Sequence, residues 1–100
     1  MSFNQAFEIN EFGHGASELL ISSIYEINQS NTPEVGGLSS SKSMKNLIEM
    51  ASKNLVIKNG KEIIGFIVCF RENSKYKSPN YKHISSLDNK FLYIDRVAIK

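Results

Sequence analysis

Cysteine is nearly absent from this sequence, and its scarcity excludes two kinds of site. The single cysteine, Cys69, cannot form a disulfide within the chain. Neither histidine, His14 nor His83, stands at a metal-ligand spacing from it. Because Cys69 lies inside an apolar run, we expect a small buried hydrophobic side chain rather than a nucleophile. The sequence therefore predicts no metal site.

The net charge is low as well, and the apolar runs are short. The formal net charge of +2 is too small to favour nucleic acid as a partner. The densest basic stretch, residues 75–82, is typical of a solvated loop, although its interleaved tyrosines leave weak binding of an anionic ligand open. The longest apolar run, residues 63–70, is far too short to cross a bilayer, and the first ten residues lack the pattern of a signal peptide. We expect a cytoplasmic protein with no membrane partner.

What is present is the composition of an ordinary globular domain. The 100 residues are 41% hydrophobic and 22% charged, which excludes the disordered class. This length suits one domain, residues 1–100, and no repeat or linker divides it.

Two segments follow a helical period. Leu20, Ile24 and Ile27 form one apolar stripe, and Ser17 is placed to cap the helix that carries it. Thr32-Pro33 ends this helix, because proline disfavours the α conformation in the preceding residue. A second helix begins at one of the serines 39–41, and its apolar face consists of Met44, Leu47, Ile48 and Ala51.

Four other segments are typical of strands. Phe3, Phe7 and Ile9 alternate in a short first strand. Asn59-Gly60 predicts a type I′ hairpin between a short arm, residues 55–58, and an apolar arm, residues 63–70, that we expect to be buried on both faces. Residues 72–90 form a long polar connection centred on Ser78-Pro79-Asn80, and residues 91–100 form the last strand. The order β-α-α-β-β-β predicts an α+β domain with a mostly antiparallel sheet.

This order of elements resembles the N-terminal half of a GNAT-type N-acetyltransferase. "NGKEIIGFIV" (Asn59 to Val68) is similar to the hairpin of that family, and "IDRVAIK" (Ile94 to Lys100) is similar to the end of its fourth strand. "EINQSNTPEVGGL", "YKSPNY" and "FLYIDRV" resemble a bacterial subgroup of uncharacterised acetyltransferases. The resemblance implies a glycine-rich turn directly after the fourth strand, where a helix N-terminus binds the coenzyme A pyrophosphate. Since the sequence stops at Lys100, we expect it to be the front part of a longer domain.

The resemblance implies acetyl-CoA as co-substrate and a small-molecule or peptide amine as acceptor, with direct transfer between them. In the family the backbone of the fourth strand binds the pantetheine arm, which places Val97, Ala98 and Ile99 at the cofactor. Their apolar side chains suit a plain core strand equally well. A homodimer is also compatible with this family.

The resemblance does not assign the catalytic base to a single residue, because the position of the family's glutamate is taken here by Tyr93. Asp95 lies two residues nearer the cofactor on the same face and is the only carboxylate of the strand, so both residues are catalytic candidates. The alternative is a structural Asp95 that pairs with Arg96, Arg71 or a helix end.

The resemblance implies acceptor contacts from two loops. The candidates are Asn31 and Glu34 between the helices, and Tyr76, Asn80 and Tyr81 before the last strand. An ordinary surface-loop role remains open for each. At the level of function, the alternative to an enzyme is a non-catalytic α+β binding or interaction module.

Overall fold

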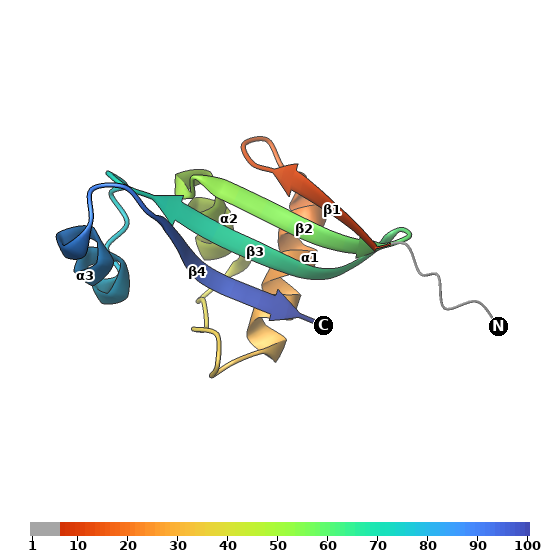
Figure 1. Cartoon of the computed structure of the whole chain (residues 1–100). Helices are drawn as coiled ribbons and strands as arrows, with labels where there is room; N and C mark the ends of the chain where they lie inside the picture. Colours follow the sequence, from red (N-terminus) through yellow and green to blue (C-terminus); the bar gives the residue numbers. More distant parts are fainter. Residues whose placement is uncertain (1–6) are drawn as a thin grey trace.

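The computed structural model describes residues 7–100, which form a sheet with two helices on one face (Figure 1). In chain order the elements are β1 (Phe7–Phe12), α1 (Glu18–Ser30), α2 (Ser41–Met50), β2 (Lys53–Asn59), β3 (Glu62–Arg71), α3 (Pro79–Leu87) and β4 (Leu92–Ile99). Within this part of the chain, the four strands lie in the order β1-β2-β3-β4, and every neighbouring pair is antiparallel. The predicted α+β class is thereby confirmed. Phe3, which was assigned to the first strand, lies outside the described residues.

The first two helices follow their sequence signals closely. The side chain of Ser17 accepts from the backbone N–H of Leu20 and caps α1, and the side chain of Ser40 accepts from that of Ser43 and caps α2. The predicted stripes face the sheet. Their fully buried members are Ile24, Ile27, Met44, Leu47 and Ile48.

The predicted element order is wrong at one point, because the polar connection contains a third helix. Ser78 caps α3 by accepting from the backbone N–H of Tyr81, and Pro79 occupies the first turn, where a missing N–H costs nothing. Tyr81 is 2% exposed and anchors the helix. Its hydroxyl donates to the carbonyl of Arg71 at 2.6 Å. Figure 1 shows α3 beyond the end of β3, away from α1 and α2.

The hairpin between β2 and β3 is confirmed, but its turn lies one residue later than predicted. Asn59 pairs with Glu62, so the central residues are Gly60 and Lys61. Gly60 has φ +63°, and a glycine at the first central position is typical of a type II′ turn. Asn59 therefore ends a strand and does not enter the turn.

The hydrophobic core lies between the helices and the face of the sheet that α1 and α2 cover. Val56, Phe66, Val68, Phe70 and Ala98 point toward the helices, and each is at most 4% exposed. Since the side chains of a strand alternate, the residues between them lie on the opposite face.

We call that opposite side the open face, because no described element covers it; it is defined by Ile9, Leu55, Ile57, Ile67, Ile94, Val97 and Ile99. The expectation that residues 63–70 are buried on both faces is therefore correct only in part, since Ile67 is half-buried. Cys69 is 4% exposed, and burial raises the pKa of its thiol, as expected for a hydrophobic rather than a reactive cysteine.

One irregularity in the sheet determines the geometry of the site. Val68 pairs with Arg96 and Cys69 pairs with Ile94, so Asp95 is an extra residue in β4, in a β-bulge. A regular strand would send Asp95 and Arg96 to opposite faces. The bulge instead lets both side chains reach groups on the helix side of the sheet.

Candidate functional site at the bulge of β4

The candidate site is a hydrogen-bonded group of side chains, the Asp95 cluster, made of Asn28, Tyr76, Asp95 and Arg96. Tyr76 donates its hydroxyl to Asp95 Oδ1 at 2.7 Å, and Arg96 Nε donates to Asp95 Oδ2 at 2.8 Å. The side chains of Asp95 and Arg96 are 6% and 10% exposed, so the ion pair is nearly removed from water. The carboxylate charge is compensated within the protein.

Arg96 connects β4 to α1 and to the loop that follows it. Its Nη1 donates to Asn28 Oδ1 at 2.9 Å and to the carbonyl of Gly36 at 3.0 Å. Asn28 is fully buried, and its Nδ2 donates to the same Gly36 carbonyl at 3.1 Å. Gln29 extends the connection, because its Oε1 accepts from the backbone N–H of Leu38 at 2.9 Å. The loop between α1 and α2 is thus fixed to the strand that carries Asp95.

Tyr76 holds the other side of the carboxylate. Its ring stacks on Phe70 with centroids 4.1 Å apart and planes 6° from parallel. Burial and the neighbouring carboxylate of Asp95 raise the pKa of Tyr76 to about 12. At neutral pH its hydroxyl is therefore protonated and acts as a hydrogen-bond donor to Asp95.

The structure brings together some of the predicted acceptor-site residues and separates others. Tyr76 contacts Asp95, and Asn31 Nδ2 lies 3.3 Å from the carbonyl of Ile99 in β4. Glu34 and Asn80 are both exposed, and no contact with the cluster is seen for either. Tyr81 is buried in the aromatic core below α3. Of the predicted acceptor-site residues, Tyr76 and Asn31 therefore contact β4 at the distances given above, whereas Glu34 and Asn80 remain exposed.

The predicted catalytic and cofactor residues of β4 differ in where their side chains lie. Tyr93 is half-buried and packs edge-on against Tyr81 with ring centroids 5.7 Å apart. Ala98 is 4% exposed and faces the helices, whereas Val97 and Ile99 are each 51% exposed on the open face. β4 is the last strand of the sheet, so among the described residues its outer backbone edge has no strand partner.

Two members of the cluster were missed as site residues. The sequence predicts Arg96 only as a partner for Asp95, and it predicts no role for Asn28. A signal for Asn28 does exist in the sequence, because it directly follows Ile27 and stands four residues after Ile24, on the buried stripe of α1. A polar residue inside an apolar stripe needs a buried hydrogen-bond partner, and here that partner is Arg96.

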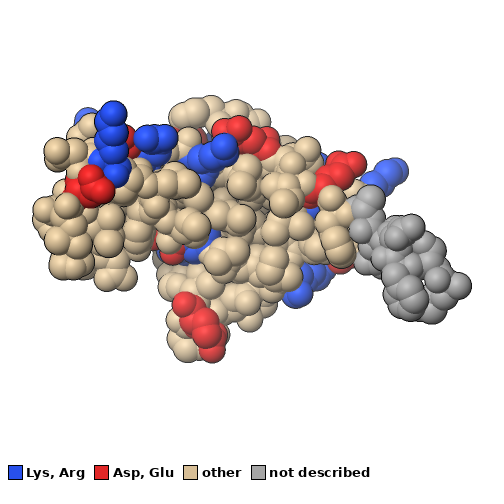
Figure 2. Space-filling view, viewed as in Figure 1, with Lys and Arg blue, Asp and Glu red and all other residues tan. Residues whose placement is uncertain are grey.

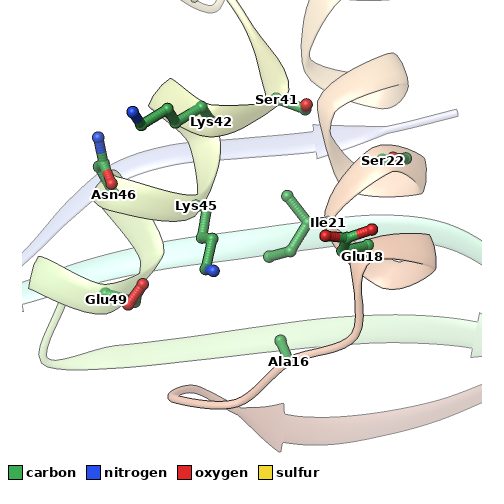
Figure 3. A pocket seen from close by; sticks show the side chains of 9 residues that line it. All are labelled: Ala16, Glu18, Ile21, Ser22, Ser41, Lys42, Lys45, Asn46 and Glu49. Carbon is green, nitrogen blue, oxygen red and sulfur yellow. The ribbon is translucent and has the colours of Figure 1, made fainter.

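A groove of about 450 Å³ between α1 and α2 is a second concave feature (Figure 3). Its floor contains Ala16 and Ile21, and the side chain of Lys45 points into it from α2. Glu18 and Glu49 stand at its sides, as expected for the solvated charges of two neighbouring helices. None of the predicted site residues lines this groove, and it does not adjoin the Asp95 cluster.

A metal site and a membrane-spanning helix are both absent from residues 7–100. No group of three or more His, Cys, Asp or Glu side chains in this range could hold a metal ion. No helix in the same range combines the length and apolar character needed to cross a membrane. Comparison of the chain with protein-family models, curated proteins and solved structures gives no match.

Proposed function

We propose that this chain carries the acceptor side of an N-acetyltransferase that moves an acetyl group from acetyl-CoA to an amine by direct attack. The observation that carries the proposal is the bulge of β4, which turns a carboxylate to the helix side of the sheet. There Tyr76 of one loop bonds it, and Arg96 connects it to Gly36 of the other loop. β-Bulges are frequent next to active sites, where they redirect a side chain. The resemblance of this strand and of the preceding hairpin to GNAT-type enzymes supports the same reading.

Each residue of the proposed site has a role that its chemistry allows. A lysine-like amine has a pKa near 10.4 and must lose a proton before it can attack a thioester. A carboxylate offers about four lone-pair positions, and Asp95 uses one on each oxygen, for Tyr76 and Arg96. Lone-pair positions therefore remain on Asp95 to accept the proton of the amine. Because its side chain is only 6% exposed, the amine would have to approach the carboxylate itself rather than act through bulk water.

The backbone of β4 is suited to holding the thioester substrate. Acetyl-CoA would supply the activated acetyl group. The outer edge of β4 at Val97, Ala98 and Ile99, which has no strand partner among the described residues, would bind its pantetheine amides as an added strand would. Asn31 would orient the acceptor, because its amide already lies near the Ile99 carbonyl. Tyr93 is the second candidate for the base, but it lies in the aromatic core.

Two measurements test the proposal. Titration of the ¹⁵N-labelled protein with acetyl-CoA should shift the amide resonances of Val97, Ala98 and Ile99 more than those of β1. Asp95→Asn should lower kcat by about a hundred- to ten-thousand-fold, with a defect that shrinks as the pH rises and the free amine becomes abundant. These rates are compared at a temperature at which both proteins are folded. Absence of shifts along β4, or near-normal kcat in Asp95→Asn, contradicts the assignment.

A non-catalytic binding or interaction module is the second candidate, and one observation favours it. Every member of the Asp95 cluster is engaged with another member or with a loop carbonyl. A purely structural role, fixing the loop between the helices, is enough to explain such a network. In that case Asp95→Asn lowers the melting temperature but leaves whatever binding the folded protein has.

A further inference from the structure

The guanidinium of Arg96 has one nitrogen whose donors are not used within the described chain. Nε donates to Asp95 Oδ2 at 2.8 Å, and Nη1 donates to Asn28 Oδ1 and to the carbonyl of Gly36. Nη2 makes no hydrogen bond with any residue of 7–100. The N–H groups of a side chain as buried as this one are normally all engaged, so the free donors of Nη2 need an explanation.

Nη2 lies at the surface of the molecule. Asn54 Oδ1 is the only fully buried side-chain nitrogen or oxygen of residues 7–100 that lacks a hydrogen-bond partner. Since Nη2 lacks a partner as well, it must be accessible to solvent. It lies beside Gly36, which is exposed. A Cβ atom at Gly36 would stand 3.9 Å from Nη2, with no other atom beyond the neighbouring residues within 4 Å. The absence of a side chain at Gly36 thus leaves Nη2 open to a ligand.

Two further polar groups adjoin this guanidinium. The carboxylate of Asp95 accepts from Nε and keeps unused lone-pair positions. The hydroxyl of Tyr76 donates to the other oxygen of the same carboxylate. Burial is the main cause that raises the pKa of Tyr76, and Arg96 partly opposes it, because its positive charge lies near the Tyr76 hydroxyl. A ligand at Nη2 therefore meets free N–H donors and a carboxylate within one small site.

The charges of this site select the chemistry of its ligand. A carboxylate is a preferred partner for a guanidinium, because charge-assisted hydrogen bonds are the strong ones. A phosphate dianion would add uncompensated negative charge beside the nearly buried Asp95. On the face that Figure 2 shows, positive and negative side chains are interspersed, without the extended field of one sign that would attract a polyanion. The site therefore favours a ligand that carries both charges.

An α-amino acid has this combination in the required arrangement. Its amine and its carboxylate are attached to one carbon, so the two groups lie about as close together as Arg96 Nε and Asp95 Oδ2, which are 2.8 Å apart. The carboxylate of the amino acid can accept from Nη2 while its amine donates to Asp95. Each charge of the ligand then faces the opposite charge of the protein.

We propose that Arg96 Nη2 binds the carboxylate of a free α-amino acid whose amine, held on Asp95, is the acceptor of the acetyl group. This inference rests on the proposed acetyltransferase activity for the fate of the amine, but the recognition of the carboxylate does not depend on it. In the transfer the ammonium group gives one proton to Asp95, and the amine forms an amide bond to the acetyl carbon. The thioester C–S bond breaks, and the thiolate takes the second proton that the nitrogen releases.

NMR titration of the ¹⁵N-labelled protein tests the recognition with three matched probes. Glycine carries both groups, methylamine lacks the carboxylate, and acetate lacks the amine. The chain contains two arginines, so the Nε–H resonance of Arg96 is read beside that of Arg71, which is exposed and paired with Glu72. Glycine at millimolar concentrations should shift the signal of Arg96 and leave that of Arg71 unchanged. It should bind at least about tenfold more tightly than either other probe, because each of them loses one charged hydrogen bond.

A substitution at Gly36 tests the position of the site without removing Arg96. The φ angle of Gly36 is not positive, so the backbone accepts another residue there. Gly36→Leu should cover Nη2 and abolish the binding of glycine. Gly13→Leu is the matched control, because an added Cβ at Gly13 meets no atom within 4 Å, and it should leave the binding unchanged. Thermal unfolding of both variants shows whether the fold is retained.

The outcomes separate this inference from the proposed function. Equal shifts of the two arginines, no shift of Arg96, or equal affinity for the three probes would overturn the amino-acid site, and so would normal glycine binding in folded Gly36→Leu. If amines without a carboxylate were acetylated as fast as amino acids, the acetyltransferase would stand and the inference would fail. If glycine bound at Arg96 but acetyl-CoA caused no shifts along β4, the amino-acid site would stand and the proposed function would fail.

Discussion

Removing the guanidinium of Arg96 should be among the most damaging single changes to this fold. Arg96→Met keeps much of the aliphatic side chain but leaves Tyr76 as the one side chain of the cluster that still donates to the Asp95 carboxylate. Asn28 Oδ1 loses the donor that it has in the structure, and the Gly36 carbonyl loses one of two. The perturbation therefore acts on β4, α1 and the loop between the helices together.

Burial sets the magnitude of the effect. With side-chain exposures of 10% for Arg96 and 6% for Asp95, water cannot replace the lost partner well. Breaking a buried ion pair on one side typically costs about 3–5 kcal/mol, because an uncompensated charge stays buried. One kcal/mol corresponds to a fall of about 4–8 °C in Tm for a domain of this length, so we expect a fall of at least about 12 °C.

Urea unfolding followed by circular dichroism measures the cost, with Lys100→Met as the control. Lys100 pairs with Glu62 at 2.9 Å, but both side chains are more than half exposed, so the control should change stability little. The double variant Asp95→Asn, Arg96→Met removes both charges and should be more stable than the sum of the single losses implies. If Arg96→Met lost no more unfolding free energy than Lys100→Met, the reasoning would be refuted. Such a result would mean that water solvates the Asp95–Arg96 pair.

Three further perturbations follow from the geometry. The pKa of Tyr76 is raised to about 12, so its contribution to stability is complete below pH 10 and is lost as the pH rises from about 10 to 12. Melting curves should show this alkaline loss of stability in the wild type and a smaller loss in Tyr76→Phe. Gly65→Ala should destabilise the protein in urea unfolding, because the new Cβ would lie 2.7 Å from Ile99 Cδ1 and 2.9 Å from the Ala98 carbonyl; a wild-type midpoint would contradict this packing. Ser78→Ala should cost about 1 kcal/mol through loss of the α3 cap, and Ser78→Asp, which can cap, should recover it.

The parts of the fold that are encoded locally could be predicted from the sequence. The stripes of α1 and α2 and their serine caps required only a helical period and one side-chain acceptor each. The third helix could not be recognised in this way, because Ser78-Pro79-Asn80 suits a turn as well as a helix start. The deciding factor is the burial of Tyr81 against Phe70, a contact between residues eleven apart in the sequence.

The candidate site was predictable in its carboxylate but not in its geometry. Asp95 stood out because the strand has one acidic residue, and its pairing with Arg96 was the stated alternative to catalysis. The contact with Asn28 spans 68 residues and depends on the packing of α1 against the sheet. Nothing in a two-residue alternation reveals an inserted residue, so the direction of the Arg96 side chain could not be read from the sequence.

The bulge at Asp95 determines which side chains of β4 lie on each face of the sheet. Ile94 and Val97 are three residues apart, yet they pair with Cys69 and Ile67, which are two apart on β3. The extra residue therefore keeps both aliphatic side chains on the open face and lets the two charged residues between them bond on the helix side. Without it, either Ile94 or Val97 would leave the open face, and the Asp95–Arg96 pair would be divided across the sheet. The buried ion pair and the shared position of Ile94 and Val97 on the open face thus have one structural cause, a single added residue in β4.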